Sequence, residues 1–265
     1  MFSAWGHEFA ALATFREYLD TLNAYRDRLH LCGVDFTALP GKDKGGKYWE
    51  VEYHQEDDIN LKAFRDNAQA LNSASTQAAA QLELIRQTED LHVYWQGEAS
   101  RAALHSYLTD STRLEQDRAH LAARSQDVAQ VARNLEATLT SKAQDASNIV
   151  NNLVNQALGN NLADFDTRLR TACEAMEANN QGGSGPFGLG TNQHRYIPHG
   201  GNGANWSAAD VRNDIQNNVI SGFGYAFNAL DKSNYATEEH LRTNYQTLLT
   251  ALDDQNGPPD TPTPQ

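Results

Sequence analysis

The sequence has little of what marks several common classes of protein. Only two of its 265 residues are cysteine, so a zinc site made of four cysteines is excluded. No apolar run approaches the roughly eighteen residues that a membrane-spanning helix needs. Lys and Arg number 21 against 34 Asp and Glu, and this net charge of −13 repels a phosphate backbone. We therefore expect neither a membrane-spanning anchor nor a nucleic-acid partner.

The beginning of the chain also lacks the pattern of a Sec signal peptide. Such a peptide needs a basic start followed by an unbroken apolar core. Residues 1–20 instead mix charged and apolar side chains, with Glu8, Arg16, Glu17 and Asp20 among them. We expect the protein to be synthesised in the cytoplasm without such a signal, so that any export would need a route for folded proteins.

The clearest pattern in the sequence is the helical spacing of its apolar and small residues. Over residues 58–93, apolar or small residues recur at steps of three and four: Leu61, Phe64, Ala68, Leu71, Ser75, Ala78, Leu82 and Ile85. From Glu98 onward the pattern continues for about sixty residues without proline, on two heptad positions: Leu114, Leu121, Val128 and Leu135, then Ala132, Leu139, Ala146 and Leu153. The two stretches predict the arms of a long helical hairpin over residues 58–158.

Further helices are expected on either side of this hairpin. Apolar spacing predicts a helix over residues 4–31, and residues 40–57 form an exposed connection in this interpretation. After the hairpin, residues 159–256 hold helices separated by a mobile Gly/Asn-rich loop at 180–205. In that region the sequence predicts a helix from Asn161 to about residue 179, a helix capped by Ser207 and Asp210, and a final helix over 237–254. Residues 257–265 are a proline-rich, extended tail.

The tripeptide Trp95-Gln96-Gly97 lies between the two hairpin arms. Gly97 tolerates a left-handed backbone, which allows a tight reversal, and Glu98 suits the positive end of the next helix. In a purely structural interpretation, Trp95 closes the end of the hairpin and has no further role.

The surroundings of this turn resemble a known family. The run Tyr94-Trp95-Gln96-Gly97-Glu98-Ala99 is followed by small and apolar residues at Ser100, Ala102, Ala103, Leu104 and Leu108. It resembles the turn and second helix of the WXG family of type VII (ESX) secretion substrates, over roughly residues 58–150. The length of the chain makes it more similar to the larger secretion-associated members, such as the EspA, EspB and PPE-like groups.

The resemblance implies a secreted or cell-envelope-associated protein that acts through protein–protein contacts. The partners it implies are a type VII secretion ATPase and a second hairpin, in a homo-oligomer or a heterodimer. Type VII substrates also carry a Tyr-x-x-x-Asp/Glu export signal, and Tyr235 with Glu239 has this spacing. Residues four apart share a helix face, so in the alternative interpretation these two are an ordinary surface pair.

The sequence offers little support for catalysis. His194, Arg195, Tyr196 and His199 lie together in the Gly/Asn-rich loop, but no acidic ligand has suitable spacing, so we expect a solvated loop, no metal and no cofactor. Cys32 and Cys173 are either two buried thiols or a disulfide formed after export.

The expected fold is thus an all-α, elongated helical bundle around the hairpin, and the expected function is non-enzymatic. Two alternatives remain. One is a delivery module whose region from residue 159 carries a toxin activity dependent on His199. The other is an intracellular scaffold or chaperone for secretion, in which the turn is only structural.

Overall fold

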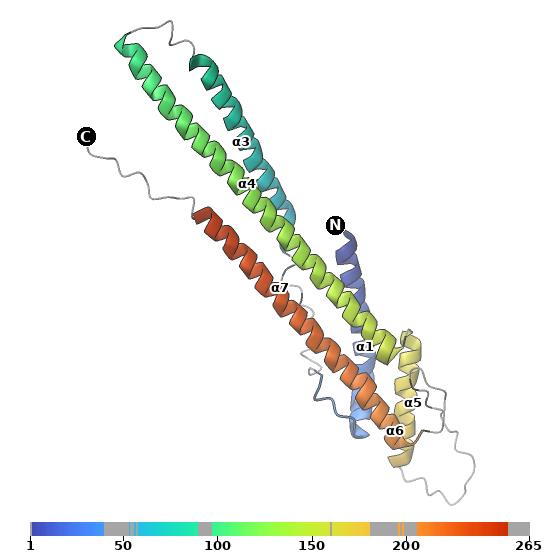
Figure 1. Cartoon of the computed structure of the whole chain (residues 1–265). Helices are drawn as coiled ribbons and strands as arrows, with labels where there is room; N and C mark the ends of the chain where they lie inside the picture. Colours follow the sequence, from blue (N-terminus) through green and yellow to red (C-terminus); the bar gives the residue numbers. More distant parts are fainter. Residues whose placement is uncertain are drawn as a thin grey trace, which may run out of the picture. The chain divides into compact units, whose positions relative to one another are not determined.

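A computed structural model describes residues 2–39, 53, 56, 58–89, 97–159, 161–180, 196, 198 and 206–253 of the chain (Figure 1). These residues fold into helices, and no strand occurs among them. The α-helices are α1 (Phe2–Leu31), α3 (Leu61–Glu89), α4 (Glu98–Leu153), α5 (Leu162–Asn180), α6 (Ala208–Asp214) and α7 (Ser221–Asp253). Two π-helical segments, η3 (Val154–Leu158) and η4 (Ile215–Ile220), follow α4 and α6. The expected all-α helical bundle is confirmed.

The chain forms two compact units, each built from segments that are far apart in sequence. The first unit contains residues 1–57 and 139–237, and the second contains residues 58–138 and 238–265. Helices α4 and α7 therefore each contribute one part to the first unit and another to the second.

In the second unit, α3 and the first part of α4 are the two antiparallel arms of the expected hairpin (Figure 1). The stripe on α3 is buried at Leu61, Ala68, Ser75, Ala78 and Leu82. Two serines bond directly to the facing backbone: Ser125 Oγ donates to the Ala68 carbonyl at 2.8 Å, and Ser75 Oγ to the Arg118 carbonyl at 3.0 Å. Such short side chains reach the other helix only where the backbones approach closely, as small residues along both stripes allow.

The core of the first unit is centred on aromatic rings from α1, α5 and α7. Phe15 of α1 meets Phe223 and Phe227 of α7 edge to face, with ring centroids 5.4 and 5.1 Å apart. Phe165 of α5 lies against Tyr18 and Phe223. The apolar face expected for the first helix is confirmed, because these α1 residues are buried: Leu12, Phe15, Leu19, Leu22 and Leu29.

The start of α7 packs tightly because two of its residues are glycine. A Cβ on Gly222 would lie 3.0 Å from Leu153 Cδ1 and 3.1 Å from Ala157 Cβ, so α7 contacts the end of α4 and η3 without a side chain between them. A Cβ on Gly224 would lie 3.2 Å from the Ala38 carbonyl oxygen. The turn after α1 is held against η4 as well, because the Gln216 amide bonds the backbone N–H and C=O of Asp35.

The separate final helix expected over 237–254 is wrong. The predicted cap at Ser207 and Asp210 is present as a reciprocal capping box, but from Ser221 the chain is one helix to Asp253. Asn234 and Thr237 hid this continuity, because they are polar residues at positions of the helix that are buried. These polar residues interrupt the apolar stripe in the sequence, but the helix continues through them.

The exposed connection expected at residues 40–57 is wrong at the two described positions, Tyr53 and Glu56, which are buried. Lys142, buried on α4, donates to the Tyr53 carbonyl and to Glu56 Oε2, both at 2.6 Å, and its Nζ lies 4.1 Å from the centre of the Tyr53 ring. A buried ammonium needs such partners. Lys142 therefore holds these two residues against α4. The composition of residues 40–57 did not indicate this contact.

We expect Phe223→Ala to destabilise the protein by about 3–5 kcal/mol, because it removes a fully buried ring that contacts both α1 and α5. Urea unfolding followed by circular dichroism measures this change. Tyr225→Ala is the matched control, since that ring is 75% exposed two residues away on α7 and should change stability by less than about 0.5 kcal/mol. Equal effects of the two substitutions would contradict this core.

Candidate functional site

The described part of the hairpin turn consists of Gly97. Trp95 and Gln96 lie outside the described residues, so their expected roles stay predictions. Gly97 has φ of +119°, a conformation that side chains disfavour, and α4 begins at the next residue. Apart from its chain neighbours, no described residue has an atom within 4 Å of the position its Cβ would take. The positive φ by itself favours glycine here.

The first turns of α4 leave apolar and small side chains accessible. Of the residues that carry the resemblance, Ser100 is buried, Leu104 is partly buried, and Ala102, Ala103 and Leu108 are exposed. The exposed Leu108, Ala102 and Ala103 are individually accessible to a partner at this end of the hairpin. This end of the hairpin is the candidate interaction site.

Tyr235 and Glu239 both lie on α7, one helical turn apart. Tyr235 is 65% exposed, and Glu239 is exposed beside Arg242, with which it forms an ion pair. Both side chains are thus available to a partner that recognises a tyrosine and a carboxylate together. The pair lies within α7, which continues to Asp253.

Of the four clustered residues of the Gly/Asn-rich loop, the structure describes Tyr196 alone. His194, Arg195 and His199 lie outside the described residues. Tyr196 and Pro198 are described and buried, so the expected solvated, mobile loop is wrong at these two positions. The Tyr196 ring packs on Trp206, with centroids 5.7 Å apart, and its hydroxyl enters a buried polar cluster.

Arg168 of α5 is the centre of this cluster, and sequence analysis missed it. Its guanidinium donates to Asp214 Oδ2 at 2.6 Å, to the Ala157 carbonyl at 2.6 Å and to the Tyr196 hydroxyl at 3.1 Å. The Tyr196 hydroxyl in turn donates to Asp214 Oδ2. Asp214 Oδ1 accepts from Asn218 at 2.6 Å. The cluster therefore joins α5 to η3, to Tyr196 and to the junction of α6 with η4.

The protonation states follow from burial and hydrogen bonding. Burial by itself raises the pKa of Asp214, but hydrogen bonds from Tyr196 and Arg168 outweigh it, so the pKa lies below its usual range. Burial by itself lowers the pKa of Arg168, but its interactions with Tyr196 and Asp214 outweigh burial and raise the pKa above its usual value. Burial raises the pKa of Tyr196 as well, so the phenol stays protonated. At neutral pH the cluster is a charged Arg–Asp pair with a neutral phenol.

This cluster is built to hold helices together. Its three groups are buried, and each interacts with the other two. A catalytic group needs access to a substrate, which these buried groups lack. No group of three or more metal-ligating side chains occurs within the part of the chain that the structure describes. No local pattern in the sequence indicated this cluster, because Arg168 and Asp214 lie 46 residues apart.

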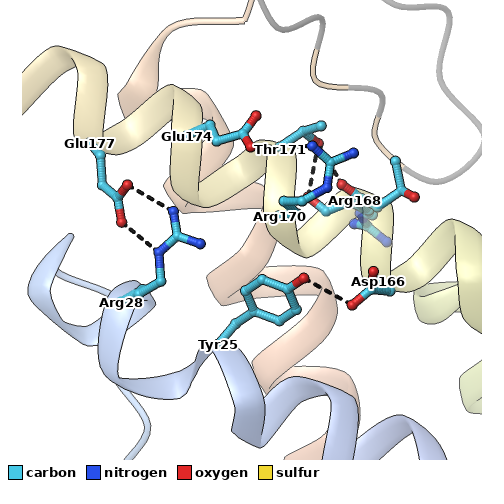
Figure 2. Close-up of polar contacts among 9 residues, drawn as sticks. Tyr25, Arg28, Asp166, Arg168, Arg170, Thr171, Glu174 and Glu177 are labelled. Atoms are coloured by element: carbon cyan, nitrogen blue, oxygen red, sulfur yellow. Dashed lines mark hydrogen bonds and ion pairs between the residues drawn. The ribbon is translucent and has the colours of Figure 1, made fainter.

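A second polar seam connects α1 to α5 near the two cysteines. Arg28 donates to both carboxylate oxygens of Glu177 at 2.8 Å, and the Tyr25 hydroxyl donates to Asp166 at 2.9 Å (Figure 2). Cys32 lies one helical turn after Arg28, and Cys173 lies one turn before Glu177. Both thiols are buried and free in this structure, and a disulfide formed after export stays the alternative that thiol titration tests. Burial raises the pKa of Cys32 above its usual value and that of Cys173 to about 12.

Comparison of the chain with protein-family models, with curated proteins and with solved structures gave no match. Among the described helices, none is long and apolar enough to cross a membrane.

We expect Asp214→Asn to cost about 3–5 kcal/mol in urea unfolding at pH 7, because it leaves the buried Arg168 charge without its carboxylate. The native pKa of Asp214 is lowered, so this contribution is full above the unfolded pKa of about 3.9 and is lost as pH falls through the native pKa. The stability difference between the two proteins should therefore shrink below pH 4. Asp20→Asn, in an exposed 3.8 Å pair with Arg16, should cost less than about 1 kcal/mol. A difference that stays constant from pH 7 to pH 3 would refute this assignment.

Thiol titration separates buried thiols from a disulfide. Because both sulfurs are buried and their pKa values are raised, the native protein at pH 8 should react only slowly with an aromatic disulfide reagent. After unfolding in urea without reductant, both thiols should react fully. Cys32→Ser, with one reactive thiol left after unfolding, calibrates the assay. Absence of reactive thiols in the unfolded wild type would show that the cysteines are oxidised.

Proposed function

We propose that this protein is a non-enzymatic substrate of a type VII secretion system, which acts through protein–protein contacts made by its helices. The α3–α4 hairpin carries this proposal: two long helical arms, with a positive-φ glycine directly before the second arm. This arrangement supports the resemblance of residues 94–108 to the WXG turn. The exposed leucine and alanines at the start of α4 supply a surface for a partner hairpin.

The proposed export signal gains support from the exposure of its side chains. A secretion ATPase would read the Tyr235 ring and the Glu239 carboxylate from one face of α7. Both groups are accessible without unfolding of the helix. A folded, hairpin-containing protein is the expected cargo of such a system, and Trp95 at the turn would contribute to recognition or to subunit contacts.

Secretion in the host that carries this gene tests the proposal. We expect the protein in the culture filtrate of the wild-type strain, and only in the cell pellet when the type VII ATPase is deleted. Tyr235→Ala and Trp95→Ala should each reduce export to the background of the deletion strain, because each removes one recognition element. Tyr225→Ala is the matched control: it removes a tyrosine of α7 that is even more exposed, and export should remain. A cytoplasmic marker protein monitors lysis.

The other outcomes discriminate the alternatives. Export that persists without the ATPase would exclude type VII secretion of this chain. Retention in the pellet of both strains would favour the intracellular scaffold or chaperone. Loss of export in all three variants would indicate a folding defect, which circular dichroism of the purified variants identifies.

A further inference from the structure

The last part of α7, residues 241–253, buries much less apolar surface than the first part of the same helix. We call residues 241–253 the strap. Within the strap, Leu241 is the one buried side chain, and Leu249 is 60% exposed. In the first part of α7, Phe223 and Leu230 are fully buried. Apolar burial therefore holds the two parts of one helix to very different extents.

An open apolar groove shows that the strap packs loosely against the α3–α4 hairpin. The groove has a volume of about 480 Å³. The strap contributes Leu248 and Leu252 to its lining, and the hairpin contributes Phe64, Leu71 and Val128 among others. Atoms on the two sides of such a gap lose much of the dispersion attraction that close packing supplies. The apolar face of the strap is thus turned toward the hairpin without filling the space between them.

Two side-chain contacts define where the strap lies on the hairpin. The rings of Tyr245 and Phe64 have their centroids 6.0 Å apart, and Asn134 of α4 donates to Asn244 Oδ1 at 3.0 Å. An asparagine pair between helices stabilises the contact less than apolar residues would, but it selects one register. The strap is therefore held weakly and in a defined position.

The strap also has little helical stability of its own. Threonine occurs at residues 243, 247 and 250, and β-branched residues lower helix propensity. Its last turn contains Asp253 and no basic residue, an unfavourable charge for the negative end of the helix dipole. Helical segments of about this length are marginal in water without packing. A strap that leaves the hairpin should therefore lose its backbone hydrogen bonds.

We propose that the strap opens by itself: residues 241–253 leave α3 and α4 and unfold, while residues 221–237 stay in the core of the first unit. Such local opening occurs where few apolar contacts hold a segment. The closed strap partly covers the hairpin residues Phe64, Leu71 and Val128, and the open form exposes them together. The strap thus controls access to this face of the hairpin. The proposal describes the isolated chain and does not depend on export.

Hydrogen exchange followed by mass spectrometry measures the opening. After correction for the intrinsic rate of each sequence, residues 241–249 should exchange at least about a hundredfold faster than residues 223–237. The first peptide ends at residue 249 because the final turn frays in any helix. Equal protection of the two segments would show that α7 opens only as a whole, and this result would overturn the proposal.

Filling the groove distinguishes an opening strap from a fraying helix end. Ala70 is exposed and lines the groove, so the side chain added by Ala70→Leu packs against the strap only in the closed form. We expect residues 241–249 to exchange at least about fivefold more slowly in this variant. Ala80→Leu, at an exposed position of α3 that does not line the groove, should change the rate less than about twofold. Because both changes lie on α3, equal rates in the two variants would indicate fraying alone and refute the strap.

Removing the asparagine contact should have the opposite effect. Asn134→Ala deletes the donor to Asn244 without altering α7, and residues 241–249 should then exchange about two- to tenfold faster. Asn148→Ala, at an exposed position of α4, is the matched control and should leave the rate within about twofold of the wild type. Far-UV circular dichroism verifies that the variants keep their helices. An unchanged rate in Asn134→Ala, or an equal change in the control, also overturns the proposal. Because no secretion is measured, this outcome is independent of the proposed function.

Discussion

The guanidinium of Arg168 imposes the strictest constraint on the first unit. A charge without water around it is tolerated only where hydrogen-bond acceptors surround it, and here the acceptors come from three separate parts of the chain. Ala157 supplies a carbonyl from η3, Asp214 supplies a carboxylate from the α6–η4 junction, and Tyr196 supplies a phenol. Apolar packing holds these elements near one another, while the charge defines which atoms must meet. Lys142 plays the same part for Tyr53 and Glu56.

Helix positions were largely predictable from the sequence, because burial of one face sets a period that persists over many residues. The stripe from Leu61 to Leu82 is buried at five of its positions and partly buried at Phe64 and Leu71, and the Ser207–Asp210 pair caps a helix as its spacing indicated. These features depend on neighbours within a few residues. Because these interactions are local, they can be predicted from one sequence without knowledge of the tertiary structure.

The buried ionic clusters were not predictable, because their members are distant in sequence. Asp214 lies 46 residues from Arg168, and Glu56 lies 86 residues from Lys142. Nothing in the sequence near Arg168 indicates which carboxylate neutralises it. Composition was misleading as well, since Tyr196 lies in a Gly- and Asn-rich stretch and is nevertheless buried. As for the candidate interaction site, the sequence indicated the turn at Gly97, but the exposure of Leu108 depends on how the helices pack.

The π-helical segment η4 affects how sequences of this kind can be compared. A π-helical turn contains more residues than an α-helical turn, so η4 takes up additional chain between α6 and α7. A relative in which η4 is an ordinary α-helix could lack one residue there and still keep Val211 and Phe223 facing the same core. An alignment that forbids gaps inside helices would then misplace every residue of α7 by one position. Buried residues of α7 in one chain would then be aligned with exposed residues in the other. The similarity of the two chains over this helix would not be detected.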